Sequence, residues 1–153
     1  MQSARAMNIV TRIAAVAMAG LVHAVALAQA SPAGLWKTID DDGKTEKSLV
    51  RITDSGGVLS GRIEKLLDPT AKPDAVCDKC TDERKDKPVL GLTILRNLKQ
   101  SADGEWWEGG DVTDPNNGKT YTARVRTIED GRKLQMRGYI GPFYRTQTWI
   151  RVD

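Results

Sequence analysis

Residues 120–140 read TYTARVRTIEDGRKLQMRGYI, and the periodicity of this stretch is the clearest indication of architecture in the chain. Apolar and polar residues alternate on either side of Glu129-Asp130-Gly131, as in two strands with one buried face each. The buried faces would carry Tyr121, Ala123, Val125 and Thr127 on the first strand and Leu134, Met136, Gly138 and Ile140 on the second. Because glycine accepts the positive φ of a tight turn, the stretch predicts a β-hairpin.

Short β-branched and aromatic runs separated by Gly, Asp and Asn turns continue across the rest of the chain. They predict eight strands, at residues 34–39, 48–53, 58–67, 91–99, 105–113, 120–128, 133–140 and 144–152. Eight sequential antiparallel strands leave two unpaired edges unless the first strand meets the last. We therefore predict an all-β fold, an eight-stranded antiparallel up-and-down barrel, with a flattened two-sheet sandwich as the alternative.

Two details of the interior follow from the same alternation. The inward residues are mostly small or medium-sized, which favours an interior filled by side chains over a large cavity. In residues 91–99, one face would carry Leu92, Ile94 and Leu98, whereas Leu95 would point to the other face.

Barrel closure has a candidate residue pair. Trp36 lies in the first predicted strand and Arg151 in the last. These strands are neighbours in a closed barrel, so the Arg151 guanidinium would cover the Trp36 ring and seal one end through a cation-π contact. The alternative is a core tryptophan and an unrelated surface arginine.

The first thirty residues have the pattern of a secretory signal. Arg5 and Arg12 precede an apolar run of small residues, which ends in the small-x-small sequence Ala28-Gln29-Ala30. We predict a signal peptide at 1–30 and a single barrel domain at 31–153, periplasmic or secreted. The run is short and weakly apolar for a spanning helix, so we expect no membrane anchor after cleavage.

Removal of this segment narrows the possible functions. His23 is the single histidine, and without it the domain has no imidazole for Ser-His or Cys-His catalysis or for a histidine-ligated zinc site. The loss of Arg5 and Arg12 leaves a nearly neutral domain, which argues against a nucleic-acid partner. We therefore predict no catalytic residues, no metal and no cofactor, and the oligomeric state is left open.

The two cysteines lie in a polar stretch, residues 76–91, VCDKCTDERKDKPVLG. An oxidising compartment and an even cysteine count favour a Cys77–Cys80 disulfide. A redox dithiol is a second reading, although the βαβ context of thioredoxin-type motifs is absent. A metal site is the third, and it would have a poor ligand set.

The whole predicted domain resembles a bacterial exported family, a lipocalin-like domain of unknown function. The resemblance is carried by Gly34-Leu35-Trp36, Gly61-Arg62-Ile63, Val76-Cys77-Asp78-Lys79-Cys80, Asp114-Pro115 with Asn117-Gly118-Lys119-Thr120-Tyr121, Met136-Arg137-Gly138-Tyr139 and Arg145-Thr146-Gln147-Thr148-Trp149. It implies a lipocalin or calycin type of barrel outside the cytoplasm and no established activity. Tyr144 replaces the glycine that usually precedes the last of these motifs, so the loop at that barrel mouth should differ.

Arginines and aromatic residues gather in the last strands. Arg124, Arg126, Arg137 and Arg145 lie on neighbouring predicted strands with Tyr139 and Tyr144, and paired guanidiniums favour carboxylates or phosphates. A solvated charged face is the alternative. Trp106 and Trp107 should point to opposite faces, one into the core and one over a mouth or an exposed patch.

These features lead to three functional hypotheses. The first is binding of a small apolar or anionic molecule at a barrel mouth, with contacts chosen by residue type and adjacency: Trp107, Arg137, Tyr139, Arg145 and Trp149. The second is a structural or interaction module of the cell envelope that uses an exposed face. The third is a thiol redox protein that uses Cys77 and Cys80.

Overall fold

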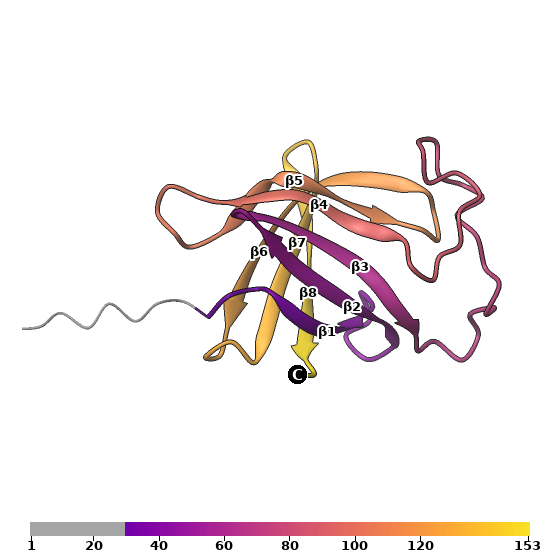
Figure 1. Cartoon of the computed structure of the whole chain (residues 1–153), viewed down its shortest axis with the longest axis horizontal. Coiled ribbons are helices and arrows are strands. Elements are labelled where there is room, and N and C mark those ends of the chain that lie inside the picture. The colour runs from indigo at the N-terminus through magenta and orange to yellow at the C-terminus, as the bar shows by residue number, and fades with distance from the viewer. Residues whose placement is uncertain (1–29) are drawn as a thin grey trace, which may run out of the picture.

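The computed structural model describes residues 30–153, and the predicted signal peptide lies outside the described residues apart from Ala30. Eight strands follow one another along the chain (Figure 1). They are β1 (Gly34–Ile39), β2 (Glu46–Ser55), β3 (Val58–Leu66), β4 (Thr93–Gln100), β5 (Trp107–Asp114), β6 (Lys119–Ile128), β7 (Lys133–Ile140) and β8 (Phe143–Arg151). Within the described part of the chain, no helix has the length and hydropathy needed to cross a membrane.

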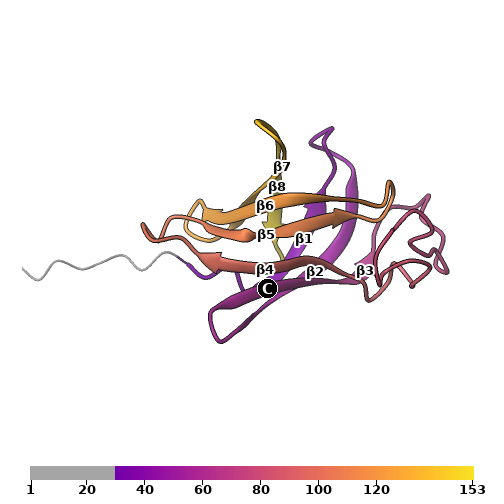
Figure 2. The same ribbon diagram turned by 90° about the horizontal axis from the view of Figure 1, so that it is seen from above.

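The strands form a closed barrel in which each strand pairs antiparallel with the next and β1 pairs with β8. Figure 2 shows β4, β5 and β6 on one side and β1 and β2 curving away behind them. The prediction of an eight-stranded antiparallel barrel is confirmed, and the two-sheet alternative is wrong. The β1–β8 seam is short, with the register pairs Trp36↔Arg151 and Lys37↔Ile150.

The up-and-down order gives the barrel two distinct ends. The β2–β3, β4–β5 and β6–β7 turns lie with both termini of the barrel at one end, which we call the closed end. The β1–β2, β5–β6 and β7–β8 turns lie at the other, the open end, together with the long β3–β4 connection at residues 67–92. Large buried side chains fill the closed half: Trp36, Val50, Ile52, Leu59, Leu98, Val125 and Leu134.

The closed end is sealed around Arg151. Its guanidinium lies 4.2 Å from the centroid of the Trp36 ring, so the structure brings the predicted pair together. The same guanidinium donates hydrogen bonds to the carbonyl oxygens of Gly131, Ala33 and Ser31 at 2.6, 3.0 and 2.7 Å. One side chain therefore connects the β6–β7 turn, the segment before β1 and the end of β8.

The prediction for the strand at 91–99 is wrong in one respect. Leu95 does not point away from Leu98, because both are completely buried and lie opposite Gly61 and Leu59, which share one face of β3. Asn97, between them, has a φ of 60° and forms a bulge that interrupts the alternation. The bulge adds one residue, so side chains three positions apart face the same interior.

Candidate functional site: a cavity at the open end

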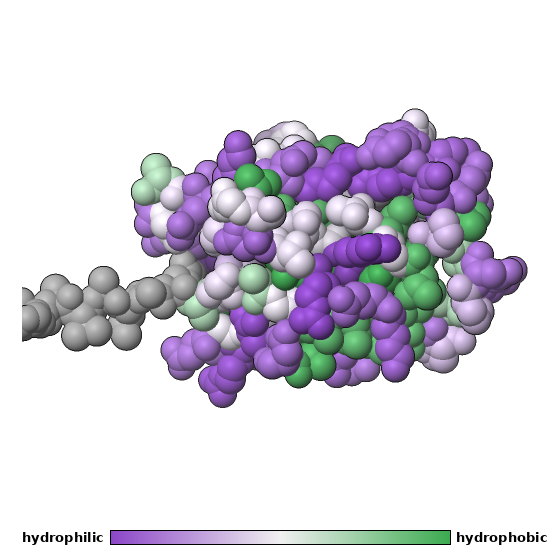
Figure 3. Space-filling model, in the orientation of Figure 1, coloured by the Kyte–Doolittle hydropathy of each residue, from purple (hydrophilic) through white to green (hydrophobic). Residues whose placement is uncertain are grey.

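A cavity of about 890 Å³ occupies the open half of the barrel. Its floor consists of buried apolar side chains from six of the strands: Ile39, Ile63, Ile94, Val112, Met136 and Trp149. Figure 3 shows apolar atoms at the surface on the side of the long connection, framed by hydrophilic residues. The predicted filled interior is therefore wrong for this half.

The hollow has a simple cause in the sequence. Inward positions near the open end are taken by small or polar residues, among them Thr38, Ser48, Thr113 and Gly138. Their side chains are too short to meet across the barrel. The bulky residues that could fill the space, above all Trp36 and Leu134, are placed in the closed half instead.

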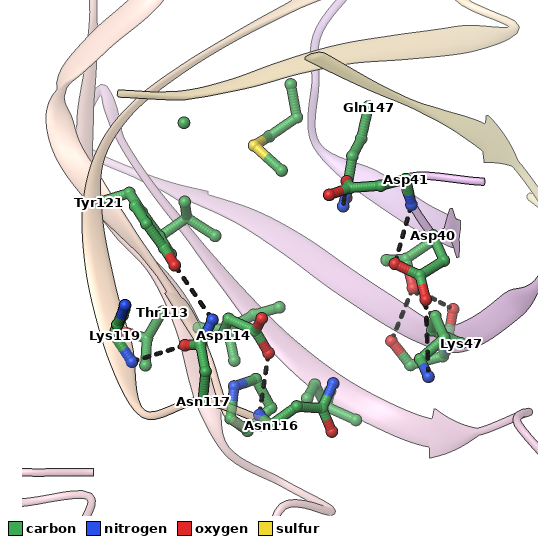
Figure 4. Close-up of a pocket in the computed structure, with 18 of the residues that line it drawn as sticks. Asp40, Asp41, Lys47, Thr113, Asp114, Asn116, Asn117, Lys119, Tyr121 and Gln147 are labelled. Carbon is green, nitrogen blue, oxygen red and sulfur yellow. Dashed lines mark hydrogen bonds and ion pairs between the residues drawn. The ribbon is translucent and has the colours of Figure 1, made fainter. Parts of the chain in front are cut away.

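Acidic and basic side chains are paired on one wall of the cavity (Figure 4). Lys47 on β2 lies 2.5 Å from an oxygen of Asp68 and 3.9 Å from one of Asp40. On the neighbouring side, Arg145 is 2.9 Å from an oxygen of Asp41, which also accepts a hydrogen bond from Gln147 at 2.8 Å. Lys47 and Arg145 thus both have carboxylate partners within the protein.

The opposite wall is built from the β5–β6 turn and the start of β6. The Asn117 amide donates to the Tyr121 hydroxyl at 3.0 Å, and the Asn117 side-chain oxygen accepts from the Lys119 backbone N–H at 2.8 Å. These bonds hold amide and phenol groups facing the polar wall across the cavity. Such groups can donate to or accept from an uncharged polar group of a ligand.

The charges around the cavity balance. The lining contains four acidic residues, Asp40, Asp41, Asp68 and Asp114, and four basic residues, Lys47, Lys72, Lys119 and Arg145. Two of the basic residues, Lys47 and Arg145, already form ion pairs with aspartates of the lining. An anionic ligand would have to compete with these aspartates for Lys47 and Arg145, whereas an uncharged ligand would leave both ion pairs intact.

The Asp68 carboxyl group should make the free energy of unfolding depend on pH. Hydrogen bonds from Lys47, and next from Thr70, hold the pKa of the Asp68 carboxyl well below its ordinary value of 3.8. A carboxyl group whose pKa is lower in the folded than in the unfolded chain stabilises the fold at pH values above its unfolded-state pKa. This stabilisation is lost as the pH falls from the unfolded-state pKa through the folded-state pKa.

We therefore expect Asp68→Asn to destabilise the protein at neutral pH, with a difference from wild type that shrinks from about pH 5 downward. Urea unfolding of both proteins at a series of pH values measures this difference. Asp74→Asn is the control, since Asp74 lies in the same connection and makes no ion pair within residues 30–153. A difference for Asp68→Asn that stays constant down to about pH 2 would contradict the assignment.

The cysteine loop packs against the cavity wall rather than forming an open reactive site. The sulfur atoms of Cys77 and Cys80 lie 1.96 Å apart, at disulfide distance, and both residues are buried. A Cβ on Gly118 in the β5–β6 turn would lie 2.0 Å from the Lys79 carbonyl oxygen, so the two backbones are in direct contact there. Among the described residues, no group of three or more His, Cys, Asp or Glu could hold a metal ion.

Buried Arg84 fixes the same connection to the barrel wall. It pairs with Asp82 and donates to the Thr93 carbonyl and the Thr120 hydroxyl, both at 3.3 Å. The hydrogen bonds from Arg84 lower the pKa of Asp82 to about 2. The contacts of Arg84 with β4 and β6 therefore attach the long connection to the barrel independently of the disulfide, which crosslinks two residues within the connection.

Loss of the disulfide should accordingly have a modest effect. Cys77→Ser/Cys80→Ser is expected to lower the free energy of unfolding by about 2 kcal/mol, the chain-entropy value for so short a loop. The far-ultraviolet spectrum of the barrel should be retained. Urea unfolding with and without reductant measures both effects, and wild type in strong reductant should match the variant. An unfolded double variant would show that the disulfide holds the fold.

The five predicted contact residues lie in three different places. Arg145 and Trp149 line the cavity. Arg137 and Tyr139 lie on the outer face of β7, where Arg137 stacks 4.7 Å from the centroid of the Tyr144 ring. Trp107 packs against the core at the closed end. The choice of residues by adjacency correctly identified neighbours on β7 and β8. It did not distinguish side chains that point into the barrel from those that point outward.

Several cavity residues were missed by the sequence analysis. Lys47 and Asp68 form an ion pair although they are 21 positions apart in the sequence, and Arg145 and Asp41 are 104 positions apart. The acidic run Asp40-Asp41-Asp42 and the motif Asn117-Gly118-Lys119-Thr120-Tyr121 are both visible in the sequence, where Asp, Asn and Gly indicate turns. Nothing in their spacing showed that the two turns face one cavity.

The closed barrel with an apolar-floored cavity at one end defines a lipocalin-like fold. The profile of a family described as "Uncharacterized protein conserved in bacteria (DUF2147)" matches residues 34–151, so the chain belongs to this family. The family resemblance seen in the sequence is thereby confirmed.

One solved structure is similar in fold. It is described as protein HP1028 from the human pathogen Helicobacter pylori, belonging to the lipocalin family. The TM-score is 0.66 at 19% sequence identity, over 79% of this chain and 82% of that chain. At this identity the likeness concerns the fold alone. A comparison with curated proteins found no match.

Proposed function

We propose that this protein binds a small molecule with an uncharged, mainly apolar body in the cavity at the open end. The observation that carries the proposal is a cavity of about 890 Å³ with a buried apolar floor. Apolar cavities of this size with a few polar groups at the edge are typical of small-molecule sites. The lipocalin-like fold is compatible with this role, and one fold can host many functions, so the cavity itself is the evidence.

The polar walls indicate which part of the ligand they would contact. Tyr121, Asn117 and Gln147 offer hydrogen-bonding groups above the apolar floor, so a hydroxyl, carbonyl or amide at one end of the ligand would fit there. The anionic part of the sequence-based hypothesis has less support at this site, because Lys47 and Arg145 are neutralised by aspartates.

The proposal extends to location. The Cys77–Cys80 pair at disulfide distance supports an exported protein, as does the signal-like sequence before Ser31. N-terminal sequencing of protein recovered from the periplasm is expected to begin at Ser31. Protein that is found in the cytoplasm and begins at Met1 would contradict this part of the proposal.

Two fluorescent probes test the binding proposal. N-phenyl-1-naphthylamine is uncharged, and 8-anilinonaphthalene-1-sulfonate adds a sulfonate to the same ring system. The uncharged probe is expected to bind about tenfold more tightly, because burial of an unpaired sulfonate would cost about 1.4 kcal/mol or more. Failure of the uncharged probe to bind would contradict the proposal, as would equal affinity of the two probes for one shared site.

A further inference from the structure

A stacked cluster of arginines and aromatic rings lies on the outer surface of the barrel wall, and only its Tyr144 end reaches the rim of the cavity. We call it the arginine–aromatic cluster: Trp106, Arg124, Arg126, Arg137, Tyr139 and Tyr144. The guanidinium carbons of Arg124, Arg126 and Arg137 lie 4.1, 4.5 and 5.0 Å from the centroid of the one Trp106 ring. Trp106 is 7% exposed beneath them. Three cations are thus held around one indole.

These three cations have no acidic counterpart in the described part of the chain. None of them forms an ion pair there, and the buried Nε atoms of Arg124 and Arg137 have no hydrogen-bond partner. Arg126 donates to the neutral amide of Gln135 at 2.9 Å. Asp103 feels the charge of Arg124 only at longer range, and its carboxylate accepts bonds from Ser101 and the Glu105 backbone. The cluster therefore presents concentrated positive charge that an external oxyanion would complement.

An exposed apolar tip adjoins the cluster. Ile140 and Phe143 pair across the β7–β8 turn and are 62% and 76% exposed, and Tyr144 is 53% exposed. The Tyr139 and Tyr144 rings, with centroids 5.3 Å apart, connect this tip to Arg137 and Arg124. Figures 1 and 2 both show the β7–β8 turn projecting from the barrel. The tip and the cluster form one continuous surface.

We propose that this surface docks on an anionic phospholipid bilayer. Ile140 and Phe143 would enter the boundary between headgroups and acyl chains, with the tyrosines at headgroup level and the three guanidiniums on lipid phosphates. A projecting tip of two apolar side chains suits insertion into lipid better than a protein interface, which needs a broad complementary face. Because the β7–β8 turn also borders the cavity, docking would place the open end beside the membrane. Docking on the bilayer would not require a ligand in the cavity.

Vesicle sedimentation tests the proposal. The protein from Ser31 onward is mixed with vesicles of equal parts phosphatidylglycerol and phosphatidylcholine, or of phosphatidylcholine alone. Arg124→Gln/Arg137→Gln is expected to weaken binding to the anionic vesicles about 25-fold, at about fivefold per charge. Phe143→Ser removes most of the inserted apolar area and should weaken it about tenfold. Since Phe143 is mostly exposed, that variant is not expected to affect folding.

Matched controls remove the same groups elsewhere. Lys65→Gln/Lys99→Gln removes two exposed charges on β3 and β4, outside the arginine–aromatic cluster, and Val152→Ser removes an exposed apolar side chain at the closed end. Both should bind like wild type. Absence of wild-type binding to anionic vesicles, equal binding to neutral vesicles, or equal losses in the controls would each overturn the proposal. Self-association abolished by Phe143→Ser, in place of vesicle binding, would identify a second copy as the occupant and would also overturn it.

Discussion

The Gly110→Ala variant is expected to lose about 3 kcal/mol or more of its free energy of unfolding, a large share of what a small domain has. A Cβ at Gly110 would lie 1.9 Å from the Arg96 carbonyl oxygen and 2.7 Å from the Asn97 carbonyl carbon. Both are backbone atoms at the β4 bulge, so no side chain can move aside. The β4 and β5 strands would therefore have to separate beside their register pair Arg96↔Asp111.

Gly109→Ala is the matched control. Gly109 has a φ of 80°, but a Cβ added there would meet nothing within 4 Å, so alanine at this position introduces backbone strain without a collision. That strain is worth about 1–2 kcal/mol. Urea unfolding of the two variants gives the free energy lost to the steric collision at residue 110 and to the backbone strain at residue 109. A smaller loss for Gly110→Ala than for Gly109→Ala would contradict the close approach of β4 and β5.

The second large effect is expected on binding. Val112→Trp places an indole on the floor of the cavity, where it would occupy space that a ligand needs. The affinity for N-phenyl-1-naphthylamine should fall about tenfold or more, equal to the loss of about 1.4 kcal/mol of apolar contact. Fluorescence titration measures the affinity, and urea unfolding establishes that the variant is folded.

Thr53→Trp is the control for this variant. Thr53 is exposed on β2, and its neighbours Val50 and Ile52 mark the buried face, so an indole at 53 points away from the interior. This protein should bind the probe like wild type. Unchanged affinity in Val112→Trp, or an equal loss in Thr53→Trp, would place the probe outside the cavity.

The strand pattern was readable from the sequence because alternation is a local property. Ala123, Val125, Leu134 and Met136 were predicted inward and are buried. Closure was also predictable, since eight sequential strands have few other ways to pair their edges. The bulge at Asn97 was not predictable. A residue with positive φ in the middle of a strand shifts which side chains point inward, but nothing in the composition of the strand indicates it.

The cavity was harder to predict than the fold. Inward side chains fill the interior only if large ones lie at the same level along the barrel axis. That level is set by the register between strands that are distant in sequence. Small inward residues such as Gly138 and Ser48 were visible, but their gathering in one half was not. The two adjacent tryptophans point to opposite faces as predicted, but the sequence did not show which is which: Trp107 packs against the core, whereas Trp106 lies on the outer face under three arginines.

One methyl group offers the most direct test of binding in the cavity. The methionines of the chain are Met1, Met7, Met18 and Met136, so a protein that begins at Ser31 has Met136 as its single internal methionine. Met136 lies on the cavity floor and is 6% exposed. Protein labelled with ¹³C at the methionine methyl is titrated with N-phenyl-1-naphthylamine. We predict that the Met136 methyl resonance shifts and saturates together with the fluorescence of the probe. A Met136 resonance that stays in place while the fluorescence reports binding would contradict a ligand site in the cavity.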